Sequence, residues 1–511
     1  MGGYQMKIER ILIEDQMAPI GLDEKKPAFS WLLTAEEGEQ NLMQSACRIV
    51  VRTGEDTVWD SGKMETGVST GIGYEGEALQ PCTKYEVKAE VWDNHGGKAE
   101  AESSFETGLM DSLYAAWEGA EWIGAPHATV CAENRGVFTI ESEFRMEGGK
   151  GEAGIVFGAN DFRLNDHTKN ELGMEGENYI RYAVCLEDGD ARLEIYRVGY
   201  APEDTAEKPF AVTKLVNWKE KTQEILTPEN ADAFHKLTVE VDGNVAYAYV
   251  DGILVDAIEE HGFFGTKVSG RQLNPRGNND VLPYPRLNEI GFYAGKGTTG
   301  YFKNLTVRNV RKPSAEIVRE TPEGRLDGGK SIFADQIPVE NGYFKVEDSQ
   351  ITADPSHHSI PMLRSCISCQ KEKKLVSARL YITARGIYDC RINGQEITED
   401  LLRPGLTQYD HRMNYQTYDI TGLMKPGRNG IGVTLASGWW SEAQTFVVKN
   451  FNYFGDKESL LAKVVMKYED GSREVFGTNT EDWKYFGEGP YLFSSYFAGE
   501  QYDARRAEVY E

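Results

Sequence analysis

The stretch Ala378-Arg-Leu-Tyr-Ile-Thr-Ala384 decides the fold class, because apolar and polar side chains alternate along it. The next stretch, Ile387-Tyr-Asp-Cys-Arg-Ile392, alternates in the same way, and Asn393-Gly394 follows it directly. A period of two is typical of a strand with one buried face, and Asn-Gly is a strong signal for a tight hairpin turn. These residues therefore predict consecutive antiparallel strands rather than a helix.

The same pattern occurs near the N-terminus. Ala46-Cys-Arg-Ile-Val-Val-Arg52 and Tyr85-Glu-Val-Lys-Ala-Glu-Val-Trp92 alternate, and the turn sequence Asp93-Asn-His-Gly-Gly97 follows the second stretch. About seven short strands in roughly 100 residues are typical of a fibronectin-III-like sandwich. We therefore predict such a module over residues 1–124, with Trp31 as a core residue.

The rest of the chain has the same texture, with one interruption. Residues 125–311 contain strand patterns such as Lys236-Leu-Thr-Val-Glu-Val241, which predict two large sheets packed face to face. Prolines and glycines gather among charged residues in 312–342, which predicts a linker. Residues 343–511 predict a second sandwich, jelly-roll-like in character. The expected fold class is all-β, as several sandwiches in one chain.

Charge and composition exclude several classes of partner. The chain has 55 Lys and Arg against 81 Asp and Glu, a net charge of −26, which disfavours nucleic acid and anionic membranes. No apolar run approaches the roughly 18 residues that a membrane helix requires. The N-terminal segment from Met1 to Arg10 has no apolar signal region, so we expect a cytoplasmic protein.

No catalytic motif is visible in the sequence. It contains no GxSxG elbow, no phosphate-binding loop, no dinucleotide-binding glycine pattern after a strand, and no HExxH pair. Pairs of carboxylates occur by chance among 81 acidic residues and indicate nothing by themselves. We therefore assign no catalytic residue. The composition fits binding modules or the accessory domains of a carbohydrate-active enzyme.

Three groups of motifs carry a family resemblance. The first comprises Ala28-Phe-Ser-Trp31, Val58-Trp-Asp-Ser-Gly62, Phe105-Glu-Thr-Gly-Leu109 and Ala120-Glu-Trp-Ile-Gly124. The second comprises Ala378 to Tyr388, Leu402-Arg-Pro-Gly405 and Gly438-Trp-Trp440, and the third is Tyr496-Phe-Ala-Gly-Glu-Gln-Tyr-Asp-Ala-Arg505. In this order they resemble the non-catalytic N-terminal region of a bacterial α-L-rhamnosidase of glycoside hydrolase family 78. The residues between them resemble an inserted concanavalin-like laminin-G sandwich.

The resemblance implies what the chain does and what it lacks. In this family an (α/α)₆ barrel follows the tract matched by residues 499–505, and two carboxylates in that barrel invert the configuration at the hydrolysed bond. We therefore expect this chain alone to be inactive and its parent protein to hydrolyse terminal α-L-rhamnosides. Two alternatives stay open: a purely structural scaffold that packs on its own catalytic domain, and a stand-alone sugar-binding protein.

The resemblance also implies a binding site in residues 343–511, because relatives of this module include rhamnose-binding modules that use calcium. Calcium takes oxygen ligands, and Asp410, Asn450 and Asn452 are the candidates in loops. Trp439, Trp440 and Tyr453 are the candidates for stacking on the apolar face of a sugar. The expected partner is a rhamnose-containing glycan or glycoside. The alternative is that Trp439 belongs to the core and that Asp410 and the asparagines are turn residues.

Overall fold

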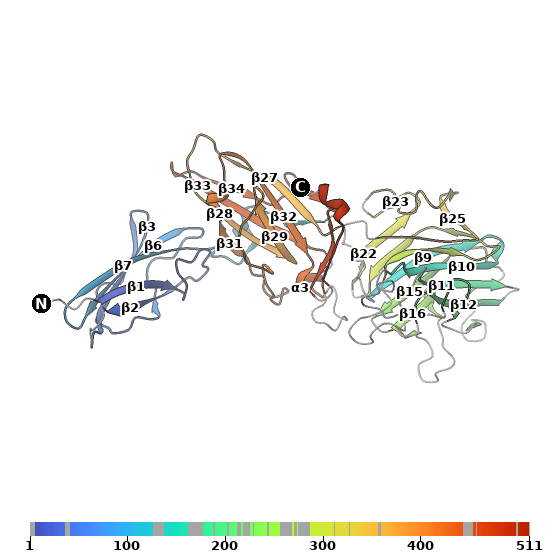
Figure 1. The fold of residues 1–511 in the computed structure, drawn as a ribbon, viewed down its shortest axis with the longest axis horizontal. Coiled ribbons are helices and arrows are strands. Elements are labelled where there is room, and N and C mark those ends of the chain that lie inside the picture. The colour runs from blue at the N-terminus through green and yellow to red at the C-terminus, as the bar shows by residue number, and fades with distance from the viewer. Residues whose placement is uncertain are drawn as a thin grey trace.

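The computed structural model of the protein describes most of the chain. The described residues are 6–35, 41–125, 137–161, 177–187, 190–201, 204–211, 216–217, 225–227, 229–242, 245–255, 268–269, 273, 287–310, 312–326, 328–355, 359–442, 453–455, 457–496 and 499–509. Nearly all elements in these ranges are strands, and they form three modules in a row (Figure 1). The predicted all-β, multi-sandwich fold is confirmed.

The first module contains two small sheets. Its strands are β1 (Met6–Ile13), β2 (Ala28–Ala35), β3 (Gln44–Thr53), β4 (Asp56–Asp60), β5 (Ile72–Gly73), β6 (Lys84–Asp93) and β7 (Lys98–Glu106). The sheet orders are β1-β2-β5 and β4-β3-β6-β7. Between them, Tyr85 and Phe105 stack with ring centroids 5.1 Å apart, and the Trp31 indole donates a hydrogen bond of 2.9 Å to Gln44. Trp31 is buried in this core, as the sequence predicted.

The middle module packs a seven-stranded sheet on an eleven-stranded sheet. The seven-stranded sheet contains β10 (Gly151–Ala159), β11 (Tyr179–Glu187), β12 (Asp190–Val198), β13 (Phe210–Ala211), β14 (Val216–Asn217), β19 (Glu289–Ala294) and β26 (Gln350–Ala353). The other contains β9 (Val137–Met146), β15 (His235–Asp242), β16 (Val245–Val250), β17 (Ile253–Leu254), β18 (Val268–Ser269), β20 (Thr299–Phe302), β21 (Leu305–Asn309), β22 (Lys312–Thr321), β23 (Gly324–Arg325), β24 (Val339–Glu340) and β25 (Tyr343–Glu347).

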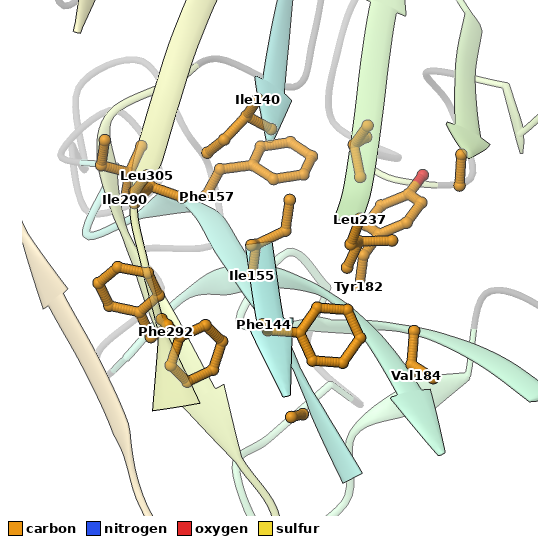
Figure 2. Packing of buried hydrophobic residues seen from close by; sticks show 14 of the residues in the cluster. Ile140, Phe144, Ile155, Phe157, Tyr182, Val184, Leu237, Ile290, Phe292 and Leu305 are labelled. Atoms are coloured by element: carbon orange, nitrogen blue, oxygen red, sulfur yellow. The ribbon is translucent and has the colours of Figure 1, made fainter. Parts of the chain in front are cut away.

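The core of the middle module is formed by side chains from the facing sides of these sheets. Ile155 and Phe157 of β10, Phe292 of β19 and Leu237 of β15 are fully buried and meet between the sheets (Figure 2). Alternate residues of β15 point inward, which is why the sequence shows a period of two there, whereas β10 and β11 are buried on both faces.

The structure corrects the predicted linker at 312–342 and the module boundary at 342/343. β22 pairs with β21, β25 pairs with β20, and β26 pairs with β19, so this stretch and the residues after it belong to the middle module. The physical reason is burial of apolar side chains: Ile317, Val318, Phe333 and Ile337 are at most 5% exposed in its core. The content of proline and glycine suggested a linker, although the stretch also contains these four apolar residues.

The third module is a sandwich of two sheets. The first has the order β30 (Gln395–Glu396), β29 (Ile387–Ile392), β32 (Gly427–Ala436), β27 (Met362–Cys369) and β35 (Lys484–Phe486). The second contains β31 (Gln416–Asp419), β28 (Leu375–Arg385), β33 (Ser459–Tyr468), β34 (Arg473–Gly477) and β8 (Ile123–Gly124). A separate pair is β36 (Tyr491–Ser495) with β37 (Gly499–Tyr502).

Helical elements are short. They are α3 (Gly438–Ser441) and the 3₁₀ turns η1 (Tyr114–Trp117), η2 (Glu147–Gly149), η5 (Thr421–Leu423) and η6 (Ala504–Val509). Among the described residues no helix is long and apolar enough to cross a membrane.

The first and third modules are joined by shared structure, although they are far apart in sequence. β8, which the sequence placed at the end of the first module, pairs with β33 of the third module. Arg379 of β28 holds Glu106 of β7 through two hydrogen bonds of 2.7 and 2.5 Å. Accordingly, the third module lies between the first and middle modules in space (Figure 1).

A second ionic contact at this junction centres on Glu118, just after η1. Its carboxylate accepts hydrogen bonds of 2.9 and 2.6 Å from the guanidinium of Arg473 and one of 2.9 Å from Lys463. The Lys463 side chain is only 2% exposed, and its ammonium also donates to the backbone carbonyl of Ala116. These hydrogen bonds, led by those from Arg473, lower the pKa of Glu118 to about 2.

Candidate functional site

An aromatic cluster surrounds α3 at one end of the third module. The chain enters the helix from β32 through Gly438, whose φ of +51° is a left-handed conformation that favours glycine. A Cβ atom at Gly438 would also lie 2.9 Å from the Ile387 side chain. This close approach fixes the direction in which the next two residues, Trp439 and Trp440, leave the sheet.

Trp439 and Trp440 each pack on partners from other parts of the module. The Trp439 ring stacks on Tyr496 with centroids 4.5 Å apart and an interplanar angle of 29°. The Trp440 ring lies 5.8 Å from Tyr409 and 6.3 Å from Phe454. Both tryptophans are half-buried, so each is supported from one side and keeps part of its surface exposed.

The third predicted stacking residue, Tyr453, lies at the edge of this cluster. It is 59% exposed and contacts Phe454 edge-on, with centroids 4.8 Å apart. The structure therefore brings Trp440 and Tyr453 together through Phe454, and Trp439 lies beside Trp440 in sequence but has a separate partner. The exposed ring of Tyr453 therefore offers an apolar surface beside the half-buried rings.

A cation lies against the cluster. The guanidinium carbon of Arg385 is 5.3 Å from the Trp440 ring and 4.5 Å from the ring of Trp122, which belongs to the segment just before β8. Burial lowers the pKa of Arg385, and its Nε has no hydrogen-bond partner among the described residues. The two indole faces stabilise this charge.

Buried polar groups lie behind the tryptophans. Ser441 donates a hydrogen bond of 2.5 Å to Glu458, and Glu442 and Glu458 are 3% and 4% exposed. The Tyr409 hydroxyl donates to the carbonyl of Gly405 at 2.9 Å, and burial raises the pKa of Tyr409 to about 12. These contacts hold the rings in place and keep Tyr409 neutral at physiological pH.

The predicted calcium ligands are only partly accounted for. Asp410 is exposed and follows Tyr409 directly, which places it at the rim of the aromatic cluster. Asn450 and Asn452 lie outside the described residues. Within the described ranges, no group of three or more His, Cys, Asp or Glu side chains could hold a metal ion, so Asp410 has no such partners there.

Sequence reasoning selected the two tryptophans, Tyr453 and Asp410. It did not select the residues that pack against the two tryptophans, which are Tyr409, Phe454, Tyr496 and Arg385. Tyr409 and Phe454 stand next to residues that were selected, and a search for aromatic neighbours within the same loops would have found them. Arg385 ends a strand, and nothing in its sequence surroundings indicates that it lies between two indoles.

Comparison with known proteins agrees with this architecture. The family described as "Rha78A-like, N-terminal immunoglobulin domain" matches residues 8–111, and "Alpha-L-rhamnosidase N-terminal domain" matches residues 373–510. These are the first and third modules, whereas neither match covers the middle module. The fold is thus that of an all-β region built from immunoglobulin-type and rhamnosidase-type sandwiches.

Individual relatives extend the similarity. An α-L-rhamnosidase of Streptomyces avermitilis is 26% identical over 504 residues, which are 97% of this chain and 42% of that protein. An α-L-rhamnosidase of Formosa agariphila is 38% identical over 132 residues, which are 25% of this chain and 14% of that protein. Residues 8–111 and 373–510 are thus similar to N-terminal domains of α-L-rhamnosidases, and the chain spans less than half the length of these relatives.

The solved structures support the fold. The crystal structure of the Streptomyces avermitilis α-L-rhamnosidase complexed with L-rhamnose superposes with a TM-score of 0.52 at 21% identity, over 98% of this chain and 43% of that chain. At this level of identity the likeness concerns the fold. It includes the middle module, which neither of the two family matches covers.

Proposed function

We propose that this chain is the accessory, carbohydrate-binding region of an α-L-rhamnosidase that hydrolyses terminal α-L-rhamnosides. The catalytic (α/α)₆ barrel is then a separate domain from the three modules, and this chain alone is inactive. The observation that carries the proposal is the match of both the first and the third module to N-terminal domains of that family. The all-β architecture of the described residues is consistent with an accessory role.

We assign sugar binding to the aromatic cluster around α3. Trp440 and Tyr453 offer ring surface, Arg385 adds a donor at the back of Trp440, and Asp410 supplies an acceptor at the rim. One stacked sugar ring contributes about 1–2 kcal/mol. Hydrogen bonds and calcium would supply the rest of the roughly 4–8 kcal/mol that a dissociation constant between millimolar and micromolar requires. Calcium, held by Asp410 together with Asn450 and Asn452, would link the sugar hydroxyls to the loops.

Calorimetric titration of the purified chain with L-rhamnose tests the site. Binding should weaken by about tenfold in Trp440→Ala and in Asp410→Ala, and chelator should weaken it in the wild type. Met43→Ala, which removes an exposed side chain of the first module, is the control and should bind as the wild type does. Equal heats in all four proteins would reject the site, and indifference to chelator would reject calcium alone.

Activity is tested separately. The chain should release no p-nitrophenol from p-nitrophenyl α-L-rhamnoside. Release that scales with protein concentration and persists through further purification would show that the chain contains its own catalytic residues. An absence of rhamnose binding with calcium present would leave the structural scaffold as the remaining function.

A further inference from the structure

The dipeptide Asn-Gly occurs three times in the chain, at Asn341-Gly342, Asn393-Gly394 and Asn429-Gly430. Asparagine is a chemically labile residue, and glycine has no side chain to shield its amide nitrogen from the carboxamide of the asparagine before it. The structure places the three pairs in very different surroundings. The sequence signature is therefore constant, and only the fold around it varies.

Asn341 and Asn393 occupy the same position in two similar hairpins. Asn341-Gly342 joins β24 to β25, and Asn393-Gly394 joins β29 to β30. The φ angles are +53° and +80° in the first turn and +51° and +80° in the second. Positive φ at both central residues is typical of a tight hairpin turn, and each turn includes a two-residue strand at the end of its sheet. Backbone geometry therefore does not distinguish these two asparagines.

The side chain of Asn393 is held by three hydrogen bonds. Its Nδ2 donates to the Leu423 carbonyl and to Asn429 Oδ1, both at 2.9 Å, and its Oδ1 accepts from the Gly430 N–H at 3.0 Å. The carboxamide must therefore leave three partners before its carbon can meet the Gly394 nitrogen.

Asn429 is held more firmly still. It is fully buried, its Oδ1 also accepts from the Lys425 N–H at 2.7 Å, and its Nδ2 donates to the carbonyls of Lys425 and Gly427 at 2.7 and 3.0 Å. The nitrogen that would attack its carboxamide belongs to Gly430, whose N–H donates to Asn393. The two asparagines of the third module thus protect each other.

Asn341 has none of these restraints. Asn341 and Gly342 are both exposed, and within the described ranges neither the Asn341 carboxamide nor the Gly342 N–H takes part in a hydrogen bond. A Cβ atom at Gly342 would meet nothing within 4 Å, so the space beside its nitrogen is open. Among the described strands β24 pairs with β25 alone. Such an edge strand opens more readily than the interior of a sheet, which lets the carboxamide approach the nitrogen.

We propose that Asn341 is a site of spontaneous deamidation and isomerisation. The Gly342 nitrogen attacks Cγ of Asn341 and forms a C–N bond, while the bond from Cγ to Nδ2 breaks and ammonia leaves with the proton of the Gly342 amide. Water then opens the resulting five-membered succinimide. Opening at Cγ gives aspartate, and opening at the main-chain carbonyl carbon gives isoaspartate. Solvent water is the only co-reactant.

The two products differ in their effect on the hairpin. Aspartate adds a negative charge beside Glu340 but keeps the backbone unchanged. Isoaspartate moves the side-chain methylene into the main chain, so the turn gains an atom and no longer fits the pairs Val339–Phe344 and Glu340–Tyr343. Because both residues of β24 are exposed, the loss of this pairing leaves the core of the middle module intact. This modification site is independent of the sugar-binding function proposed above.

The test is incubation of the folded chain at neutral pH, followed by tryptic digestion and mass spectrometry. Cleavage after Lys and Arg places the three pairs in separate peptides, residues 331–345, 392–412 and 429–448. The first peptide should gain the mass that accompanies the change from an amide NH2 to OH. Its rate should exceed that of the other two by about tenfold or more, because hydrogen bonds must break before Asn393 or Asn429 can react. Methylation by an isoaspartate-specific methyltransferase should label the same peptide.

Two controls assign the result to the fold and to Asn341. In denaturant the three peptides should react at similar rates, because the hydrogen bonds of Asn393 and Asn429 are then lost. Asn341→Gly accepts the positive φ but lacks the carboxamide, so it should melt as the wild type does while its peptide gains no mass.

Three outcomes would overturn the proposal. The first is a rate at Asn341 in the folded chain no higher than at Asn393 or Asn429. The second is a reaction at Asn341 in denaturant only, which would mean that the turn protects it. The third is a mass gain that persists in Asn341→Gly, which would assign the reaction to Gln336 of the same peptide.

Discussion

Glu118 and Glu152 are both glutamates beside a buried cation, but their surroundings differ. Glu118, at the junction of the first and third modules, accepts three hydrogen bonds from Arg473 and Lys463. Glu152 forms an outer-face cluster with Arg181 and Tyr293 on the seven-stranded sheet of the middle module. It accepts a hydrogen bond from Tyr293, and its other oxygen, 3.7 Å from Arg181, has no hydrogen-bond partner among the described residues. The pKa of Glu118 falls to about 2, whereas the pKa of Glu152 rises. The glutamate–cation contact at Glu118 is fully hydrogen-bonded and joins two modules. The contact between Glu152 and Arg181 lacks a hydrogen bond.

The largest expected effect is the loss of stability when the contact of Glu118 with Arg473 and Lys463 is removed. Glu118→Gln removes the charge that compensates Lys463, which is 2% exposed. We expect a loss of about 2 kcal/mol in the free energy of unfolding, less than the roughly 3–5 kcal/mol of a fully buried pair because Glu118 is 37% exposed. Eight of the nine tryptophans lie outside the middle module, so tryptophan fluorescence during urea unfolding reports the affected modules.

The control for this variant is Glu469→Gln, which breaks the exposed pair between Glu469 and Lys374. Their side chains are 64% and 73% exposed, so this variant should unfold at the same urea concentration as the wild type. Equal destabilisation by the two variants would mean that the junction pair is no more important than a surface pair.

A somewhat smaller effect is expected in the pH dependence. A lowered folded-state pKa means that the contribution of Glu118 is complete above its ordinary pKa of 4.5 and is lost as the pH falls from there to about 2. The difference in melting temperature between the wild type and Glu118→Gln should therefore shrink below pH 4.5. A difference that grows on acidification would contradict the assigned pairing.

Glu152 should show the opposite sign. Its raised pKa means that stability increases as the pH falls through that pKa toward 4.5, because the folded state takes up the proton first. The charges that act on it are those of Arg181, Arg192 and Glu194. Calorimetric scans of Glu152→Gln should accordingly differ from the wild type most at neutral pH and least near pH 4.5.

A modest effect is expected for Tyr293→Phe, which removes the hydroxyl that bonds Glu152 but keeps the ring beside Arg181. The loss in unfolding free energy should be about 1 kcal/mol, measured by differential scanning calorimetry of the middle-module transition. Tyr249→Phe, on the eleven-stranded sheet, is a tyrosine control within the same module. A larger loss of unfolding free energy than in Glu118→Gln would show that the Tyr293–Glu152 hydrogen bond contributes more to stability than the contacts of Glu118 at the junction.

The smallest effect should come from Glu152→Gln itself. Replacing a poorly compensated carboxylate by an amide of the same shape should change the unfolding free energy by less than about 0.5 kcal/mol near neutral pH. This small change in unfolding free energy distinguishes Glu152 of the outer-face cluster from Glu118 at the junction. A loss of more than about 2 kcal/mol in the free energy of unfolding, measured by calorimetry, would show instead that the charge of Glu152 stabilises the fold.

The two regions also differ in how far the sequence reveals them. The strands were predictable because apolar and polar side chains alternate along several of them, as along Ala378–Ala384, although most residues on both faces of that stretch are buried. The α3 cluster was partly predictable, because Trp439 and Trp440 stand together after a strand. The outer-face cluster was not, because Arg181 lies in a stretch whose two faces are both buried. Only the register of β10, β11 and β12 brings Glu152 and Glu194 onto the same face as Arg181.

The contact of Glu118 with Lys463 at the junction could not be predicted from local sequence patterns either. Glu118 precedes Lys463 by hundreds of residues, and no local pattern links them. The prediction of a linker at 312–342 was wrong because it rested on the proline and glycine content of the stretch. Phe333 and Ile337 of this stretch are buried between the sheets.

The pairing of β8 with β33 has a consequence for synthesis on the ribosome. Gly124 is made 335 residues before its partner Ser459 (459 − 124), and the whole middle module emerges between them. At about 5–20 residues per second, the third module waits roughly 20–70 seconds for its last strands after β8 has appeared. A middle sandwich that folds promptly shortens the distance between the two waiting segments, so the inserted module can act as an internal folding aid for the module that encloses it.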